Sequence, residues 1–343
     1  MTEESSIASH LSVDMTTTGM TQITGGNTAI SSSPRGIDFY FQIAVLMIGV
    51  VGTAANALVL YALFVSKQHT NNVLIVHQNA LDLFTSFFMI VTYTTRLCNV
   101  HLTGSVGYWL CTMIISECLS WWGTIASAIN LAIITVERYL KVVHPVWSKN
   151  KLKNWMIYLE MVTTWIISLI NNIAVVFPTS GVIEGVCYPY MIWNNKAARM
   201  FYFTWNFVSF YLIILVIFVF CYWRIVVVIR RQARVMASHA ADGSSAAQNQ
   251  LNEIQSSVIK TMIFVSACYA ISWLPAYIQF LIATLHSNPL DVGSIYYASV
   301  LLAYSYMCIN PFIYATKLDP VRQVLIRLIP CKKTSEQAAG NVA

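Results

Sequence analysis

Ionisable residues are rare in the long apolar stretches of this sequence, so each one marks a position where chemistry is possible. Asp82 lies deep in such a stretch, whereas Glu117 and Glu160 lie nearer to the ends of theirs. Burying a carboxylate in apolar surroundings is costly, so we expect Asp82 either to bind a cation or to be protonated and hydrogen-bonded. Both chemistries remain open on the sequence alone.

The neighbours Glu137 and Arg138, followed by Tyr139, end another apolar stretch and form a candidate ion pair. A lone arginine there could simply extend its charged head into water while its stem covers apolar surface. An adjacent acid instead offsets the cost of holding the charge in apolar surroundings. Such a pair can open when another group accepts the arginine, which makes it a candidate switch.

Two prolines, Pro275 and Pro311, also lie inside apolar stretches. Each removes one backbone hydrogen bond and is expected to kink its helix. Kinked helices in a bundle are a plausible two-state element that can carry a signal from one end to the other.

The elements that must position these residues are membrane spans. The chain has 343 residues, of which 57% are hydrophobic and 10% are charged, whereas soluble proteins carry about 25% charge. A helix crosses the hydrocarbon with roughly 20 apolar residues, and only helices or closed barrels can satisfy their backbone there. The apolar stretches are too long and continuous for barrel strands. They cover residues 39–65, 73–95, 109–136, 155–177, 200–223, 261–285 and 293–316.

The sequence therefore predicts an all-α membrane protein with a seven-transmembrane helix bundle. Of its 20 Lys and Arg residues, only Arg35, Arg96, Lys196 and Arg199 fall on the side of the N-terminus. The positive-inside rule then places the N-terminus outside the cell and the C-terminus in the cytoplasm, in a multi-pass protein of the plasma membrane. The net charge of +6 follows from this topology, so no nucleic-acid partner is expected.

The expected organisation is a disordered extracellular tail (1–38), a seven-helix domain (39–317), an amphipathic interfacial helix (318–330) and a cytoplasmic tail (331–343). No cleavable signal peptide is recognised, and the third cytoplasmic loop, residues 235–253, has the composition of the least structured loop.

The interfacial helix is predicted from a short amphipathic pattern that starts at Asp319 and Pro320. Val321 and Leu325 share one face, and Arg322 lies away from it. Cys331, just beyond this helix and beside Lys332 and Lys333, is either a palmitoylation site or an ordinary free thiol.

Three cysteines, Cys98, Cys111 and Cys187, belong to the oxidising outer face and allow at most one disulfide. A helix from Cys111 to Arg138 would extend roughly 40 Å, the depth of a bilayer with its headgroups. Cys111 is thus expected at the outer mouth when Arg138 lies at the inner one.

The motifs resemble those of the rhodopsin-like (class A) G-protein-coupled receptors, over about residues 39–330. In chain order they are Gly52 and Asn56, Asn79-Ala80-Leu81-Asp82, Glu137-Arg138-Tyr139, Trp165, Ser272-Trp273-Leu274-Pro275 and Asn310-Pro311-Phe312-Ile313-Tyr314. The resemblance implies a receptor that binds an extracellular ligand and activates a heterotrimeric G protein. It implies no enzymatic role, and no Walker loop, zinc-binding histidine pattern or nucleophile elbow is visible.

The resemblance also assigns roles to individual residues. It implies a coupling switch, a disulfide between Cys111 and Cys187 with Cys98–Cys187 as the alternative, and a sodium site. The switch residues are Glu137, Arg138, Tyr139, Tyr222, Asn310, Pro311 and Tyr314. The sodium ligands would be Asp82, Ser127, Asn310 and Asn56.

Two departures from the family pattern are expected to change local structure. The spacing from Cys111 to Arg138 is about two residues longer than is common in the family, which indicates a bulge or a different helix start. Ile214 stands about where the fifth span usually has a proline, and Tyr269 replaces a common Phe below Trp273.

The ligand pocket is expected in the outer half of the bundle. Its predicted residues are Glu117, Ser120, Trp121, Thr124, Trp273, Tyr277, Phe280 and Tyr304. Residues 293–316 contain no Lys for a retinal Schiff base, so no retinal is expected. Ser120 stands where monoamine receptors have an Asp, although Glu117 could still pair with a cation.

A peptide ligand is favoured, because the region from Glu137 to Pro145 and the short third loop look most like invertebrate peptide-type receptors. The alternatives are a small-molecule or amine receptor of the same family and a seven-helix transporter or ion pump. A transporter would need several buried ionisable groups along a path, and only Asp82 lies deep.

Overall fold

The computed structural model describes residues 35–69, 72–190, 193, 195–239, 246–285, 294–317 and 319–328. Residues 1–34 of the predicted N-terminal tail and Cys331 lie outside these residues, whereas residues 35–38 of that tail already form the start of a helix that extends to Val65. The described residues from Ile37 onward belong to one compact unit. Within the described residues, seven helical segments are long and apolar enough to cross a membrane. These segments are Gly36–Val65, Val73–Leu97, Gly104–Val143, Asn154–Thr179, Lys196–Gln232, Ile259–Ile282 and Ser294–Thr316. The prediction of a seven-transmembrane bundle is confirmed.

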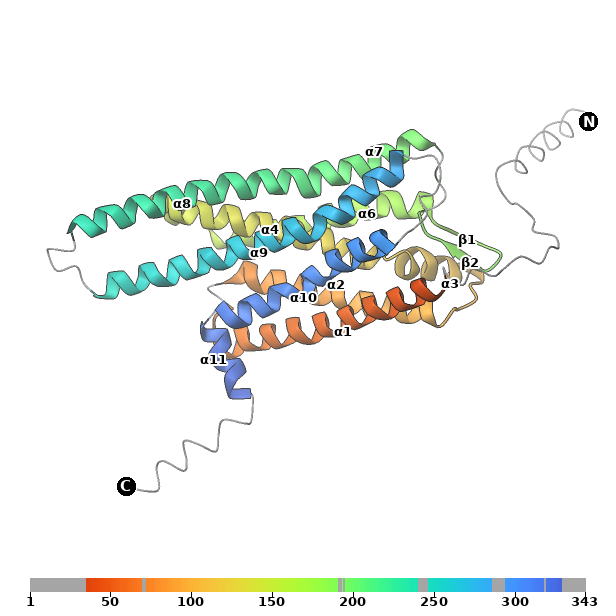
Figure 1. Ribbon diagram of the computed structural model, residues 1–343, viewed down its shortest axis with the longest axis horizontal. Helices are drawn as coiled ribbons and strands as arrows, with labels where there is room; N and C mark the ends of the chain where they lie inside the picture. The colour runs from red at the N-terminus through yellow and green to blue at the C-terminus, as the bar shows by residue number, and fades with distance from the viewer. Residues whose placement is uncertain are drawn as a thin grey trace, which may run out of the picture. The chain divides into compact units, whose positions relative to one another are not determined.

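Helices run side by side along the bundle, with a small hairpin at one end (Figure 1). The first two spans are the helices α1 (Arg35–Val65) and α2 (Val73–Leu97). The third span consists of α3 (Gly104–Trp109), the π-helical turn η1 (Leu110–Ile115) and α4 (Cys118–Val143), and the short α5 (Pro145–Lys151) follows it.

The fourth span is α6 (Asn154–Thr179), and the fifth combines α7 (Lys196–Phe207), the π-helical turn η2 (Val208–Leu212) and α8 (Ile213–His239). The sixth and seventh spans are α9 (Ala246–Leu285) and α10 (Ser294–Lys317), followed by α11 (Asp319–Leu328).

The hairpin pairs β1 (Gly181–Ile183) with β2 (Val186–Tyr188) in antiparallel register, so that Cys187 lies opposite Val182. Its two-residue turn has positive φ at both Glu184 (51°) and Gly185 (78°), as the twist of a tight hairpin requires.

Several helices extend beyond their apolar stretches. The prediction of an unstructured loop at 235–253 is wrong at both ends, because α8 continues to His239 and α9 begins at Ala246. Residues 246–254 are rich in Ala, Gln, Asn, Leu and Glu, several of which favour helix strongly. Apolar sequence indicates which part of a helix faces lipid, whereas helix propensity also influences where the helix ends.

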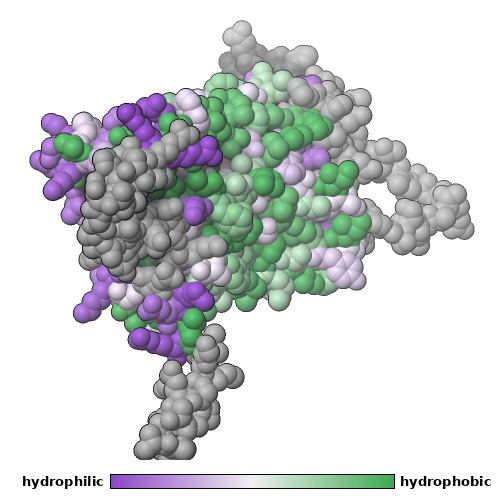
Figure 2. Space-filling view, turned by 60° about the vertical axis from the view of Figure 1, so that its left-hand side comes forward, coloured by the Kyte–Doolittle hydropathy of each residue, from purple (hydrophilic) through white to green (hydrophobic). Residues whose placement is uncertain are grey.

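The outer surface of the bundle is apolar, as expected for a protein whose solvent is lipid. Hydrophobic residues cover the middle of the face in Figure 2, and hydrophilic residues gather at one end. On α8, for example, the apolar side chains of Val216 and Val219 are largely exposed, at 68% and 71%. A surface of this kind is stable only in contact with hydrocarbon.

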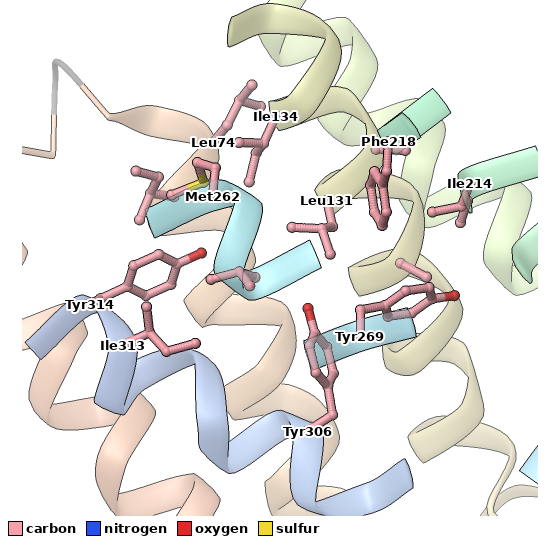
Figure 3. Close-up of a cluster of buried hydrophobic side chains, with 14 of the residues drawn as sticks. Leu74, Leu131, Ile134, Ile214, Phe218, Met262, Tyr269, Tyr306, Ile313 and Tyr314 are labelled. Atoms are coloured by element: carbon pink, nitrogen blue, oxygen red, sulfur yellow. The ribbon is translucent and has the colours of Figure 1, made fainter. Parts of the chain in front are cut away.

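The core beneath this surface joins residues from most of the spans. Figure 3 shows Leu74, Leu131, Met262, Ile313 and Tyr314 packed together from four different helices. The helix α11 adds Val321, which is buried in the same cluster, whereas Arg322 and Arg327 are exposed.

Small residues let the helices approach closely. A Cβ built on Gly123 of α4 would lie 2.2 Å from the hydroxyl of Thr85 on α2, and one on Gly52 of α1 would lie 2.5 Å from the hydroxyl of Ser86. The packing of α2 against both neighbours therefore depends on glycine at these two positions.

Candidate functional site

A cavity of about 600 Å³ lies at the end of the bundle that carries the bond between Cys111 and Cys187, called here the disulfide end. Its wall is chiefly aromatic. The rings are Phe41, Tyr93, Trp121, Tyr190, Trp193, Tyr202, Phe203, Phe210, Tyr269, Trp273, Tyr277, Phe280, Tyr296, Tyr297 and Tyr304. A cavity of this size and composition fits a drug-sized molecule or the tip of a larger ligand.

All of the predicted ligand residues except Ser120 line this cavity. On α4 the wall is formed by Trp121, Thr124, Ile125 and Ala128, the spacing of one helical face. Ser120 lies about 100° away from Trp121 around the helix, and it is buried with no hydrogen-bond partner for its hydroxyl among the described residues. The prediction that Ser120 faces the cavity is wrong, because α4 turns the helical face that carries Trp121 toward the cavity and Ser120 lies on another face.

The third span is interrupted in the region where the sequence spacing predicted a bulge or a different helix start. The π-helical turn η1 is followed by Glu117, whose φ of 62° is left-handed, and α4 begins at Cys118. A left-handed conformation is uncommon for residues other than glycine and persists only where surrounding contacts hold it. The interruption turns the Glu117 side chain into the cavity.

Glu117 is fully engaged by three neighbours. Arg96 Nη1 lies 2.8 Å from Glu117 Oε1, and Tyr93 donates a hydrogen bond of 2.9 Å to the same oxygen. Tyr304 donates to Glu117 Oε2. Arg96 is itself held by the carbonyl of Ile115, at 2.5 Å from Nη2, and lies over the ring of Tyr93. Glu117 therefore already has a cation and two hydroxyl donors.

Sequence reasoning missed Arg96 and Tyr93, because Arg96 was read only as a topology signal. The spacing of the two residues was the available indication, since a Tyr and an Arg three residues apart on α2 share one helical face. The remaining charged wall residues are Asp38, which accepts a hydrogen bond of 2.8 Å from Gln42, and Arg199. Arg199 forms no ion pair within the part of the chain that the structure describes.

The floor of the cavity is a contiguous set of rings around Trp273. The Trp273 ring lies 6.0 Å from that of Trp121 and 6.0 Å from that of Tyr277, and 6.4 Å from that of Tyr269. The indole nitrogen of Trp273 is buried and has no partner among the described residues. It is thus a donor available to a ligand, since an unpaired buried N–H is costly.

The fifth span has its own irregularity, just before Ile214. The π-helical turn η2 presents the carbonyl of Phe210, which accepts a hydrogen bond of 2.5 Å from the hydroxyl of Tyr269. Tyr211 donates in return to the carbonyl of Ala270 at 2.9 Å. The two tyrosines therefore join the fifth and sixth spans where the sequence lacks a proline, and π-helical turns of this kind are frequent at functional sites.

Tyr190, which follows β2, also lines the cavity. Burial raises the pKa of this tyrosine well above its ordinary value, so Tyr190 stays a neutral hydrogen-bonding group.

At the opposite end of the bundle, Glu137 contacts two cations. Arg138 Nε lies 3.4 Å from Glu137 Oε2, and Lys141 Nζ lies 2.5 Å from Glu137 Oε1. Arg138 Nη2 also lies 3.5 Å from the side-chain oxygen of Asn72. The distance between Glu137 and Arg138 is therefore long, and Glu137 also pairs with Lys141. Both features make Arg138 easier to release from Glu137.

Two predicted switch tyrosines lie near this end, and they differ in the hydrogen bonding of their hydroxyls. The hydroxyl of Tyr222 lies 3.0 Å from that of Thr135 and 2.9 Å from that of Ser266. The hydroxyl of Tyr314 is buried without a hydrogen-bond partner among the described residues, although Figure 3 shows its ring packed beside Ile313 and Met262. A buried unpaired hydroxyl is costly, so a rearrangement that pairs Tyr314 would be favoured.

Asp82 accepts hydrogen bonds on both carboxylate oxygens. Ser127 donates to Oδ1 at 2.7 Å, Asn310 donates to Oδ2 at 2.9 Å, and Gln78 lies 3.4 Å from each oxygen. Asn56 is directed elsewhere, because its amide donates to the carbonyls of Gly52 and Met307.

The same region offers further oxygens to a cation. Asn56 and Asn310 each keep a buried side-chain oxygen that has no hydrogen-bond partner among the described residues. Orphaned acceptors beside a carboxylate fit the oxygen ligands that hard cations prefer. The residues present are thus compatible with a sodium ion, although the amide nitrogen of Asn310, and not its oxygen, faces Asp82.

A one-directional chain of hydrogen bonds reaches Asp82 from the fourth span. Trp165 can only donate, and it does so to His77 Nε2 at 3.0 Å, so His77 must donate through Nδ1 to the side-chain oxygen of Asn130 at 2.9 Å. Asn130 donates to Gln78 at 2.8 Å, and Gln78 donates to Ser127. Ser127 in turn donates to Asp82. The geometry thereby assigns the tautomer of His77 and links the second, third and fourth spans.

The disulfide joins Cys111 of η1 to Cys187 of β2, with 5.4 Å between the Cα atoms. Cys98 is free and exposed. The pairing implied by the family resemblance is confirmed, and the alternative through Cys98 is excluded.

Comparison with known proteins agrees with this architecture. Residues 55–314 match the family described as "7 transmembrane receptor (rhodopsin family)". The mouse (Mus musculus) somatostatin receptor type 3 is 25% identical over 329 residues, which cover 92% of this chain and 75% of that protein. The rat (Rattus norvegicus) galanin receptor type 1 is 23% identical over 320 residues, covering 89% and 87%.

A third relative, the mouse neuropeptide Y receptor type 4, is 25% identical over 294 residues, covering 77% of this chain and 72% of the relative. The family match extends over most of the chain and includes most of the cavity wall, Asp82 and Arg138. The chain therefore belongs to the rhodopsin family of seven-transmembrane receptors.

Proposed function

We propose that this receptor binds a peptide in the cavity at the disulfide end and activates a heterotrimeric G protein at the Arg138 end. The observation that carries the proposal is the aromatic set around Trp273. It forms the floor of the cavity and continues through Tyr269 toward the core that surrounds Tyr314. Ligand contact at Trp273 can thus be passed on by packed side chains that have two arrangements.

The ion pair that Glu117 forms favours a peptide over a monoamine as the ligand. An amine ligand needs a free carboxylate as counter-ion, and Glu117 already pairs with Arg96 at 2.8 Å. The relatives support the same choice, since they are named for somatostatin, galanin and neuropeptide Y. The cavity also presents hydroxyl and indole groups that suit a peptide backbone.

The proposal places the disulfide end outside the cell, together with the N-terminus, in the plasma membrane. The distribution of Lys and Arg supports this orientation, because most of them lie on the side of Arg138. A sodium ion held by Asp82 and Ser127, with Asn310 and Asn56 nearby, is proposed as an allosteric ligand. Palmitoylation of Cys331 also stays a proposal.

The test is to express the full chain in cells and to record G-protein activation against a panel of neuropeptides and a panel of biogenic amines. We expect a peptide response that is absent in Arg138→Ala at matched surface expression. An amine response with no peptide response would contradict the ligand class. Ion or substrate flux without any G-protein response would contradict the receptor function and favour a transporter.

A further inference from the structure

One cation in the wall of the aromatic cavity has no acid to pair with among the described residues. The charged residues that line this cavity are Asp38, Arg96, Glu117 and Arg199. Arg96 and Glu117 neutralise each other at 2.8 Å, whereas Arg199 forms no ion pair within the described part of the chain. The charge of Arg199 is therefore open to a ligand that enters the cavity.

The register of the fifth span directs Arg199 into the cavity. Tyr202, Phe203 and Asn206 of the same helix line the cavity as well, and they follow Arg199 by three, four and seven residues. Residues at these spacings share one face of a helix. Arg199 thus belongs to the face of α7 that forms the wall, where it is half-buried.

The helix dipole of α7 makes this position unfavourable for a cation. The helix begins at Lys196 with no acid in its first turn, and the N-terminus of a helix favours negative charge. Asp38 is in the opposite situation, because it lies in the first turn of α1 and accepts a hydrogen bond of 2.8 Å from Gln42. Figure 1 shows α1 and α7 on opposite sides of the bundle. The cavity wall is therefore positive at α7, and an anion bound there would offset both Arg199 and the dipole.

An aromatic cluster belongs to the same part of the wall as Arg199. The ring of Trp193 lies 6.0 Å from that of Tyr202 and 6.2 Å from that of Phe203. The ring of Phe203 in turn stacks on that of Phe280 at 6.0 Å. A surface of this kind binds a large apolar group and excludes water, which strengthens an ion pair beside it. The wall therefore suits a carboxylate that adjoins a large apolar group.

We propose that Arg199 binds a carboxylate of the activating peptide, next to a large apolar side chain of that peptide. A guanidinium group matches a carboxylate through two parallel N–H···O hydrogen bonds. A free C-terminus and the side chain of an acidic residue both supply this group. The inference rests on the proposed peptide-receptor function and adds the charge of the ligand to it.

The first experiment uses the purified full receptor and two probes that differ in charge, N-acetyltryptophan and N-acetyltryptophanamide. The rise in melting temperature with probe concentration measures the binding of each. We expect the acid to bind roughly tenfold more tightly than the amide, as for one hydrogen-bonded charge pair. Arg199→Gln should bind the two probes equally. No acid preference in the native receptor, or an acid preference that persists in Arg199→Gln, would overturn the assignment.

Lys196→Gln is the matched control, because Lys196 carries the same charge on α7 but is exposed and does not line the cavity. This variant should keep the acid preference. Loss of the preference there would show that the overall charge of this end, and not Arg199, attracts the acid. A second measurement needs no variant, since N-acetyltryptophan and not its amide should protect Arg199 from phenylglyoxal, as read by mass spectrometry. Equal protection, or none, would overturn the proposal even where Arg199→Gln fails to fold.

The second experiment separates this inference from the proposed function. Each peptide of the neuropeptide panel is applied with a free or an amidated C-terminus, and with its acidic side chains kept or replaced by amides. Removal of one carboxylate should weaken G-protein activation roughly tenfold in the native receptor but not in Arg199→Gln, and the sensitive form identifies the source. Activation that ignores every carboxylate would overturn this inference alone. If no peptide activates the receptor, the proposed function fails, while the two probes still decide whether Arg199 binds a carboxylate.

Discussion

Arg96 and Glu117 form an ion pair of 2.8 Å inside the wall of the aromatic cavity, with 24% and 10% of their side chains exposed. The pair joins the second span to the break in the third span, because Arg96 also binds the carbonyl of Ile115. It therefore holds the left-handed turn at Glu117 and removes the net charge of that part of the wall.

The first prediction concerns the stability of this pair. Arg96→Met should lower the unfolding free energy by about 3 kcal/mol, because it leaves the carboxylate of Glu117 buried without a cation. Thermal unfolding of the purified receptor measures the loss. Arg199→Met is the matched control, since Arg199 lines the same cavity without an ion pair among the described residues.

The double variant Arg96→Met with Glu117→Gln should recover part of the stability, because it removes both charges of the pair. Additive losses in the double variant would show that the two residues do not interact as the structure indicates.

The second prediction separates G-protein coupling from the ion pair itself. Arg138 and Lys141 both contact Glu137, at 3.4 Å and 2.5 Å. Arg138→Ala should abolish ligand-driven G-protein activation at normal surface expression, whereas Lys141→Ala should retain it. Equal loss in the two variants would mean that the charge balance of Glu137, and not Arg138, carries coupling.

The third prediction concerns the disulfide. Cys111→Ser should destabilise the receptor by about 3 kcal/mol, since the bond closes a loop of 76 residues in the unfolded chain. Cys187→Ser and the double variant should give the same loss, because each removes the same bond. Cys98→Ser should change little, since Cys98 is free and exposed. Thermal unfolding and thiol titration of the four variants provide the measurement.

The fourth prediction tests the sodium proposal. Replacing choline by sodium in the buffer should raise the melting temperature of the receptor, because a ligand that binds only the folded state stabilises it. Asp82→Asn should remove this increment, since it removes the charged ligand. Gln78→Leu serves as the control, because Gln78 lies 3.4 Å from Asp82 yet is not one of the proposed ligands. A sodium effect that persists in Asp82→Asn would place the ion elsewhere.

The sequence alone was sufficient for the spans, the family and part of the cavity wall. Long uncharged stretches are read directly as spans, because an isolated charge in hydrocarbon is costly. Trp273, Tyr277 and Phe280 could be placed on one wall because they share a helical face. The extra residues between Cys111 and Arg138 predicted a bulge or a different helix start, and the π-helical turn η1 shows that the bulge is present.

What only the tertiary structure decided is how side chains from different spans meet. Glu117 was read as a possible counter-ion for an amine, and its pairing with Arg96 became visible only when the second and third spans were packed together. Ser120 was misplaced because the break at Glu117 resets the face that α4 presents. Hydrophobic periodicity reports which face of a helix is buried, but not which partner a buried polar group finds, because that choice depends on the relative rotation and depth of separate helices.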